Sequence, residues 1–210
     1  MCIRDSIGTP GIGGFKGVIG KGTNKRKSKD YGIWEAMIRR CYLETDSNYK
    51  NYGAVGITVT EEWHDFQSYA AWYSVNCMQE DLLIDKDLLH AGNKIYSPET
   101  CCAVPVYLNN MFSTGARGAY LLGTRPSTSK NLDTYYSTIY TGGKVKRLGT
   151  FPTMEEAHRA WQGAKIIHMQ EQLDRYKTEV CYREDVHKAV QSRINLLVED
   201  FEQGRVSTYL

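Results

Sequence analysis

The stretch from Leu83 to Phe112 constrains the fold most, because it predicts a strand, a turn, a second strand and a helix in close succession. Its opening apolar run ends in Leu-Ile-Asp-Lys-Asp, and alternation along a strand would place Asp85 and Asp87 on one face. Turn dipeptides follow, the first of them Gly92-Asn93, and they fold the chain back on itself. The small apolar residues from Cys101 to Val104 then predict the second strand.

A short helix is expected directly after that strand. Pro105 suits the first helical position, where its missing N–H costs nothing. The helix would carry Asn109 and Asn110, and spacing alone does not choose between them. Carboxylates on one arm and an amide on the other are hard oxygen ligands, and they could meet around a divalent cation.

Size and composition limit the class of protein. The 210 residues suffice for one large or two small domains, and 41% hydrophobic with 24% charged residues is typical of a globular protein. The six cysteines form no C-x-x-C pair, which argues against zinc and for reduced thiols in a cytoplasmic protein. The sequence has no apolar run of the roughly 18 to 20 residues that span a bilayer, so we expect no membrane association.

The beginning of the chain, residues 1–29, is rich in glycine, lysine and serine, and we expect a flexible basic segment. Its glycines do not fit the phosphate-loop spacing G-x-x-x-x-G-K-[ST]. The basic run from Lys21 to Lys29 is by default a solvated tail. It could also lie along a phosphate backbone and add affinity without sequence choice.

A helix from Asp30 to about Leu43 is predicted by an apolar stripe that includes Trp34 and Met37. Arg39 and Arg40 lie off the stripe, and we take them as candidate DNA contacts. A short strand and a second helix should follow, with an apolar face beginning at Phe66. These elements would pack beneath the strand–turn–strand–helix stretch.

The C-terminal half predicts a hairpin and two helices. Tyr135 to Tyr140 alternates as strands do, and Gly142-Gly143 is a hairpin turn before a returning strand. A first strand is expected near residues 118–122. Thr153 would cap a helix, whose pattern breaks from Leu173 on. A final amphipathic helix from Arg183 to Gln203 could pack on its own chain or on a second copy; we expect a monomer.

Several motifs resemble one family in their order. Tyr31-Gly-Ile-Trp, Tyr52-Gly-Ala-Val-Gly-Ile, Glu62-Trp-His-Asp-Phe and the Leu83–Phe112 stretch are similar to the ββα-metal core of phage-borne HNH homing endonucleases. Leu148-Gly-Thr-Phe with Glu155-Glu-Ala is similar to the Apetala/ERF-type DNA-binding modules appended to such nucleases. The resemblance covers about residues 15 to 176. Val55 departs from it, because the family often has an arginine there.

The resemblance implies a metal site. Asp85 takes the ligand place on the first strand and Asn109 the ligand place on the helix, with Asp87 as an additional carboxylate. Lys86 stands where the superfamily usually keeps its histidine base, so His90 is the nearest candidate base and His64 a more distant one. The cofactor would be Mg²⁺ or Mn²⁺. The alternative is that the aspartates only cap a turn and that His90 is a surface residue.

The C-terminal module would contact double-stranded DNA through its hairpin, since a two-stranded ribbon can enter the major groove. Alternation places Lys144 and Lys146 on one face of the returning strand and Arg147 on the other. A solvated sheet face is the competing interpretation. The candidate contacts in this module are Arg125, Lys130, Tyr136, Thr138, Lys144, Lys146 and Arg147.

We therefore expect an α+β protein that cleaves DNA with a divalent metal at a site chosen by the C-terminal module, in the cytoplasm of a bacterial or phage-infected cell. Two rivals stay open: a DNA-binding protein that has lost cleavage, and a phage-encoded interaction protein on a nuclease scaffold. The expected divisions are a flexible basic segment at 1–29, an HNH-like core at 30–114, an Apetala/ERF-like module at 115–177 and a C-terminal helix at 178–210.

Overall fold

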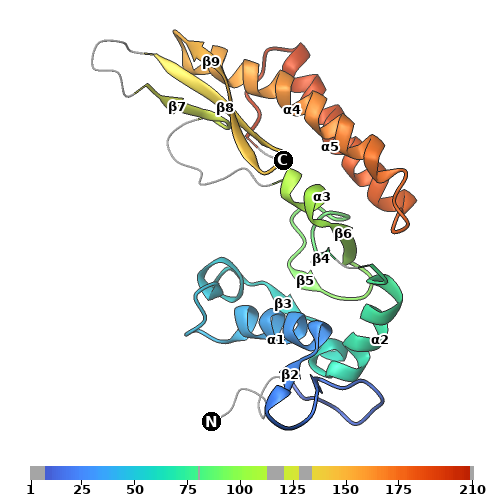
Figure 1. Cartoon of the computed structure of the whole chain (residues 1–210). Helices are drawn as coiled ribbons and strands as arrows, with labels where there is room; N and C mark the ends of the chain where they lie inside the picture. Colours follow the sequence, from blue (N-terminus) through green and yellow to red (C-terminus); the bar gives the residue numbers. More distant parts are fainter. Residues whose placement is uncertain (1–7, 80, 113–120, 128–133, 209–210) are drawn as a thin grey trace. The chain divides into compact units, whose positions relative to one another are not determined.

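A computed structural model describes residues 8–79, 81–112, 121–127 and 134–208. The chain is mixed α+β, as predicted, and it divides into two compact units, Met1–Val104 and Pro105–Leu210 (Figure 1). The predicted boundary between residues 114 and 115 lies outside the described residues. The short helix α3 (Val106–Met111), which follows the strand–turn–strand stretch, belongs to the second unit.

The first unit is built around an aromatic core. The predicted stripe of α1 is buried, and Trp34 Nε1 donates to the Trp63 carbonyl at 2.7 Å. Phe66 and Tyr69 of α2 complete this core with both side chains fully buried. The elements of this unit are β1 (Val18–Ile19), η2 (Gly22–Asn24), β2 (Arg26–Lys27), α1 (Lys29–Tyr42), η3 (Tyr49–Asn51), η4 (Gly53–Val55), β3 (Thr58–Val59), η5 (Glu61–His64), α2 (Phe66–Asn76), β4 (Leu82–Asp85), β5 (Ile95–Tyr96) and β6 (Cys102–Pro105).

The stretch from Leu83 to Phe112 forms its predicted strands and helix. β4 ends at Asp85 and pairs with β6, so the two predicted arms are neighbours in one small sheet. Between them β5 pairs in parallel with β3 instead, with Val59 opposite Tyr96. Pro105 is the N-cap of α3 rather than its first helical residue. Strand, turn, strand and helix therefore follow one another as expected.

The second unit contains a three-stranded antiparallel sheet with the order β7-β8-β9. Gly142 and Gly143 connect β8 to β9 with φ of 58° and 76°, which the predicted Gly-Gly turn requires. The strand that pairs with β8 begins at Thr124; of residues 118–122, where a first strand was expected, only Leu121 and Leu122 are described, and neither belongs to a strand. Besides α3, the unit contains β7 (Thr124–Pro126), β8 (Tyr135–Thr141), β9 (Lys144–Phe151), α4 (Met154–Tyr176) and α5 (Glu184–Glu202).

Helix α4 begins where the capping box predicts, because the Thr153 hydroxyl accepts from the Glu156 N–H at 3.2 Å. The helix was predicted to break from Leu173 on, but it continues to Tyr176. Leu173 and Tyr176 are fully buried, so the helix continues for as long as it has apolar side chains to pack. The predicted face of α5, which includes Val186 and Leu197, is buried, and α5 packs along α4 of the same chain (Figure 1).

Candidate functional site

Two aspartates and a buried lysine form a tight turn at the end of β4. One carboxylate oxygen of Asp85 accepts from the backbone N–H groups of Asp87 and Leu88, at 2.9 and 2.8 Å. This is the turn that an Asp side chain forms with the backbone ahead of it. Asp85 therefore caps the strand end, as the competing interpretation expected, with one of its two oxygens.

Lys86 points inward, with only 8% of its surface exposed. Its ammonium donates to the Asp87 carboxylate at 2.8 Å and to the Asn93 carbonyl at 3.1 Å. The Asn93 amide in turn donates to the Lys86 and Ile95 carbonyls, both at 2.7 Å, which closes the loop between β4 and β5. Lys86 thus acts as a cationic partner of Asp87.

The two carboxyls titrate together. Burial raises the pKa of Asp85, and the neighbouring Asp87 carboxyl raises it further. For Asp87, burial acts against ionisation, but hydrogen bonds from Asp85 and Lys86 outweigh it and lower the pKa. Asp87 is therefore the ionised member of the pair, and Asp85 is the one that holds a proton more readily.

A divalent cation fits this pair in its donor chemistry. Two hard oxygen donors lie within one turn, and burial together with the neighbouring Asp87 carboxyl raises the pKa of Asp85, so a bound cation would favour its ionised form. Two carboxylates are few for such an ion, and within the described residues no group of three His, Cys, Asp or Glu side chains gathers to hold a metal. Further ligands would have to be amide, water or phosphate oxygens.

The two candidate bases differ in their surroundings. His90 is exposed beside the acidic turn, and its backbone carbonyl accepts from Asn93 at 3.0 Å. His64 is part of the core edge, with Nε2 3.2 Å from the Tyr42 hydroxyl. That hydroxyl also bonds to the Val59 backbone. Of the two candidate bases, His90 is thus the solvent-exposed one.

Asn109 is the predicted helical ligand, and it lies on α3 within the second unit. Its side chain is partly buried, whereas that of Asn110 is exposed. The helix is fastened inside its own unit: Leu108 is fully buried, and the Lys165 ammonium of α4 donates to the Met111 carbonyl. A meeting of Asn109 with the two aspartates stays a prediction.

The outer face of the three-stranded sheet carries four of the seven DNA contacts predicted in the C-terminal module. Ser137 and Ile139 of β8 are buried on the inner face, which α4 covers, so Tyr136 and Thr138, which alternate with them, point outward. Arg147 lies opposite Thr138 in the register, and its guanidinium stacks over the Tyr136 ring at 4.8 Å. The predicted residues on this outer face are Arg125, Tyr136, Thr138 and Arg147.

The two predicted lysines of β9 belong to the other face. Lys146 lies opposite the buried Ile139, and Lys144 lies opposite Thr141, whose hydroxyl is 3.2 Å from the His168 ring of α4. Both lysines are exposed, because β9 is the edge strand. Alternation therefore separates them from Arg147 as predicted, and Lys130 lies outside the described residues.

The arginines of α1 have different partners. Arg39 is exposed and pairs with Asp46 at 3.3 Å. The Arg40 guanidinium lies between the Tyr52 and Tyr96 rings, 4.7 and 5.0 Å from their centres, and donates to the Tyr96 hydroxyl at 2.7 Å. Arg39 is thus a solvent-exposed side chain, whereas Arg40 holds the η4 and β5 segments together.

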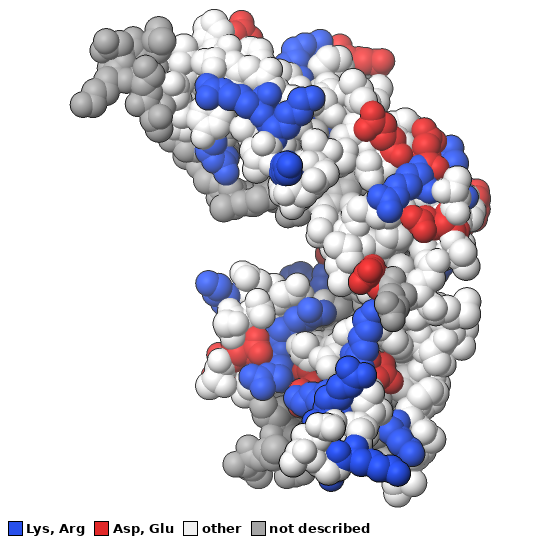
Figure 2. Space-filling model, viewed as in Figure 1, with Lys and Arg blue, Asp and Glu red and all other residues white. Residues whose placement is uncertain are grey.

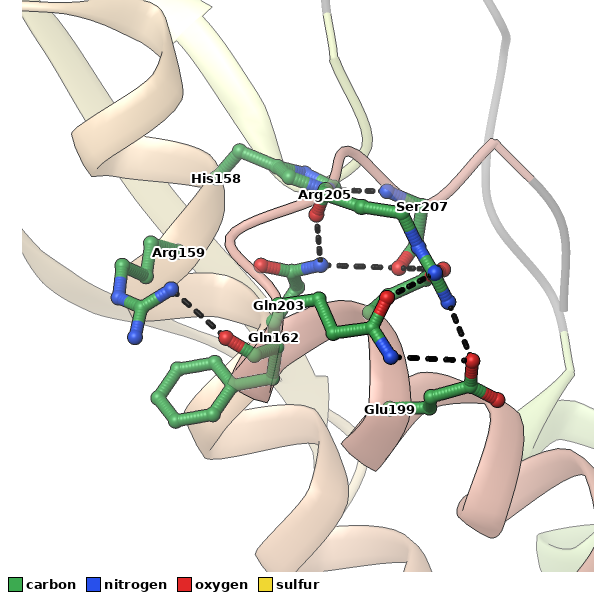
Figure 3. A network of polar contacts seen from close by, with 9 residues as sticks. His158, Arg159, Gln162, Glu199, Gln203, Arg205 and Ser207 are labelled. Atoms are coloured by element: carbon green, nitrogen blue, oxygen red, sulfur yellow. Dashed lines mark hydrogen bonds and ion pairs between the residues drawn. The ribbon is translucent and has the colours of Figure 1, made fainter.

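A buried polar network in the second unit was not anticipated from the sequence (Figure 3). His158 of α4 accepts from the Ser207 N–H at 3.1 Å, and its other ring nitrogen lies 2.9 Å from the Leu122 carbonyl. Gln162 donates to Ser207 Oγ, which donates to Asp200. The network fastens the segment after α5 onto α4, which is a structural role.

Comparisons with protein-family models, with curated proteins and with solved structures found no match. Among the helices of the described residues, none is long and apolar enough to cross a membrane.

Proposed function

We propose that this protein is a metal-dependent DNA endonuclease of the HNH type, with its cleavage site chosen by the second unit. The observation that carries the proposal is the β4–β6 pair with Asp85 and Asp87 at the end of its first strand, followed at once by α3. This is the order of elements that a ββα-metal nuclease uses.

The residues of the acidic turn would divide the work of cleavage among them. Asp85 and Asp87 would hold Mg²⁺ or Mn²⁺, and such an ion polarises a scissile phosphate. Asp85 keeps one oxygen on two backbone N–H groups, which fixes the direction of the other. Exposed His90 would take the proton from the attacking water.

The outer face of the sheet supports duplex DNA as the substrate. Arg125 and Arg147 are exposed there, and Figure 2 shows basic side chains gathered over the region of this sheet. Arg147 is held in place by the Tyr136 ring and by the Thr150 hydroxyl at 2.7 Å. A guanidinium fixed in this way loses little side-chain entropy when it contacts a phosphate or a base.

A DNA-binding protein without cleavage is the second candidate, and one contact favours it. The Lys86 ammonium already neutralises Asp87 at 2.8 Å, in the place where a cation would otherwise bind. In that case the sheet would bind DNA and the acidic turn would be structural.

Metal binding at the turn separates the two candidates without reference to activity. Titration of the protein with Mn²⁺, followed by electron paramagnetic resonance, should show one site that Asp85→Asn and Asp87→Asn each weaken at least about tenfold. Asp46→Asn, a half-buried acid that pairs with Arg39, is the matched control and should leave the affinity unchanged. If neither turn variant changes the Mn²⁺ affinity, the nuclease proposal is contradicted and the DNA-binding candidate is favoured.

A further inference from the structure

The basic segment before α1 is a folded hairpin and not only a tail. β1 and β2 pair antiparallel, with Ile19 opposite Arg26, and η2 lies in the loop between them. Gly20 makes the bend possible, because its φ is +93° and a Cβ there would lie 2.3 Å from the Asn24 carbonyl oxygen. The hairpin therefore gives its charged residues a fixed backbone.

The segment is also pinned to the body of the first unit. The Gln67 amide of α2 donates to the Pro10 and Phe15 carbonyls, both at 3.0 Å, and accepts from the Phe15 N–H at 3.0 Å. Gly17 lies so close to the Tyr31 ring that a Cβ would come within 2.4 Å of it. These contacts hold the base of the hairpin against α1 and α2.

The charge of this element is one-sided. Residues 8–29 contain six of the lysines and arginines and no acid, whereas the whole chain has a net charge of only +2. Lys27 pairs with Glu35, but Lys21, Lys25 and Arg26 are exposed and have no acidic partner within the described residues. The remainder of the chain therefore has a net negative charge, and the hairpin is a local positive site.

We infer that the β1–β2 hairpin is a second nucleic-acid contact, one that binds the phosphate backbone of duplex DNA separately from the outer face of the sheet. Because the hairpin backbone is already folded, only the side chains need ordering when a polyanion binds, which lowers the entropic cost of the contact. The inference rests on the proposed function in that it takes duplex DNA as the polyanion. Figure 2 shows basic side chains gathered over the part of the first unit where Figure 1 draws β2 and its loops.

An anionic membrane is the competing partner, because Ile12, Phe15 and Val18 are exposed beside the cations. The charge distribution favours DNA. A membrane presents a broad plane of negative charge, which the acidic remainder of the chain would oppose. A duplex presents a narrow line of phosphates that the hairpin can contact by itself.

The test compares two triple variants of the full chain that lose the same charge. Lys21→Gln/Lys25→Gln/Arg26→Gln removes the unpaired hairpin cations, and Lys50→Gln/Lys177→Gln/Lys188→Gln removes three other exposed lysines. Affinity for a labelled random-sequence duplex is measured by fluorescence anisotropy from low to physiological salt. The hairpin variant should lose at least about tenfold in affinity, and its slope of log K against log salt should fall by about 2 to 3. The control variant should change the slope by less than about 1.

The outcomes distinguish this inference from the nuclease proposal. Wild type that binds duplex, with a hairpin variant indistinguishable from the control variant, overturns the inference alone. A hairpin variant with the predicted loss, in a protein that binds no Mn²⁺ at the acidic turn, supports the inference and removes the nuclease proposal. Binding to phosphatidylserine vesicles that needs the three cations, without duplex binding, overturns the inference in favour of a membrane.

Discussion

At the scale of single residues, the protein buries polar side chains that the helical pattern of the sequence would predict to be solvent-exposed. His158, Gln162 and Lys165 of α4 are each at least 95% buried. The first two are satisfied by the segment around Ser207, more than forty residues away. Sequence periodicity could not reveal such partners, because they come from a distant segment that packs against α4 only in the folded chain. Asp85 is the opposite case, because its partners are the next residues along the chain.

The buried Lys165 should make the free energy of unfolding depend on pH in the alkaline range. Burial lowers the pKa of its ammonium to about 8, against 10.5 in the unfolded chain, so the unfolded state binds the extra proton between these values. The free energy of unfolding should therefore rise between pH 8 and 10, by at most about 3 kcal/mol. Urea unfolding at several pH values checks this. Lys165→Met should abolish the rise, and a rise that persists in this variant would assign it to another group.

The buried His158 should make the stability of the second unit depend on pH in the acidic range. Burial lowers its pKa below 6.5, so protonation accompanies unfolding as the pH falls through and below 6.5. The second unit should lose stability there and keep it fully above that pH. His158→Gln should flatten the dependence in part, because His168 of the same helix also has a pKa lowered by burial. An unchanged acid profile in the variant would contradict a titrating role for His158.

At the scale of elements, local signals predicted what local chemistry determines. The α1 stripe, the Gly142-Gly143 hairpin and the Thr153 cap formed as expected, since each depends on residues within a few positions. The end of α4 was missed because Leu173 and Tyr176 extend the helix through burial against other elements. The position of β7 was missed for a related reason: Thr124 is fully buried, and pairing with β8 determines where that strand lies.

Substitutions on the two faces of the sheet should affect DNA binding unequally. Arg125→Gln and Arg147→Gln should each weaken duplex affinity and reduce the salt slope by about 1, because both residues lie on the outer face. Lys144→Gln is the matched control on the face that α4 covers, and it should have the smaller effect. Fluorescence anisotropy over a salt series measures all three. Equal losses from the three variants would mean that the sheet does not bind through one face.

At the scale of the whole molecule, the candidate site could be predicted only in part. The acidic turn and the strands on either side follow from the Leu83–Phe112 sequence and lie in the first unit, up to Val104. Asn109 lies in the second unit, and bringing a residue of one unit to a turn of another is a tertiary question that no local pattern answers. The candidate sheet face and basic hairpin likewise belong to different units.

Plasmid nicking tests the central proposal most directly. Wild-type protein with Mg²⁺ or Mn²⁺ should convert supercoiled plasmid to relaxed or linear DNA, and chelator should stop it. Asp85→Ala should reduce the rate at least about a hundredfold while duplex affinity is retained, because the aspartate serves the cation and not the DNA. An Asp85→Ala variant that nicks as fast as wild type, or a wild type that binds duplex and nicks with neither metal, would contradict the account.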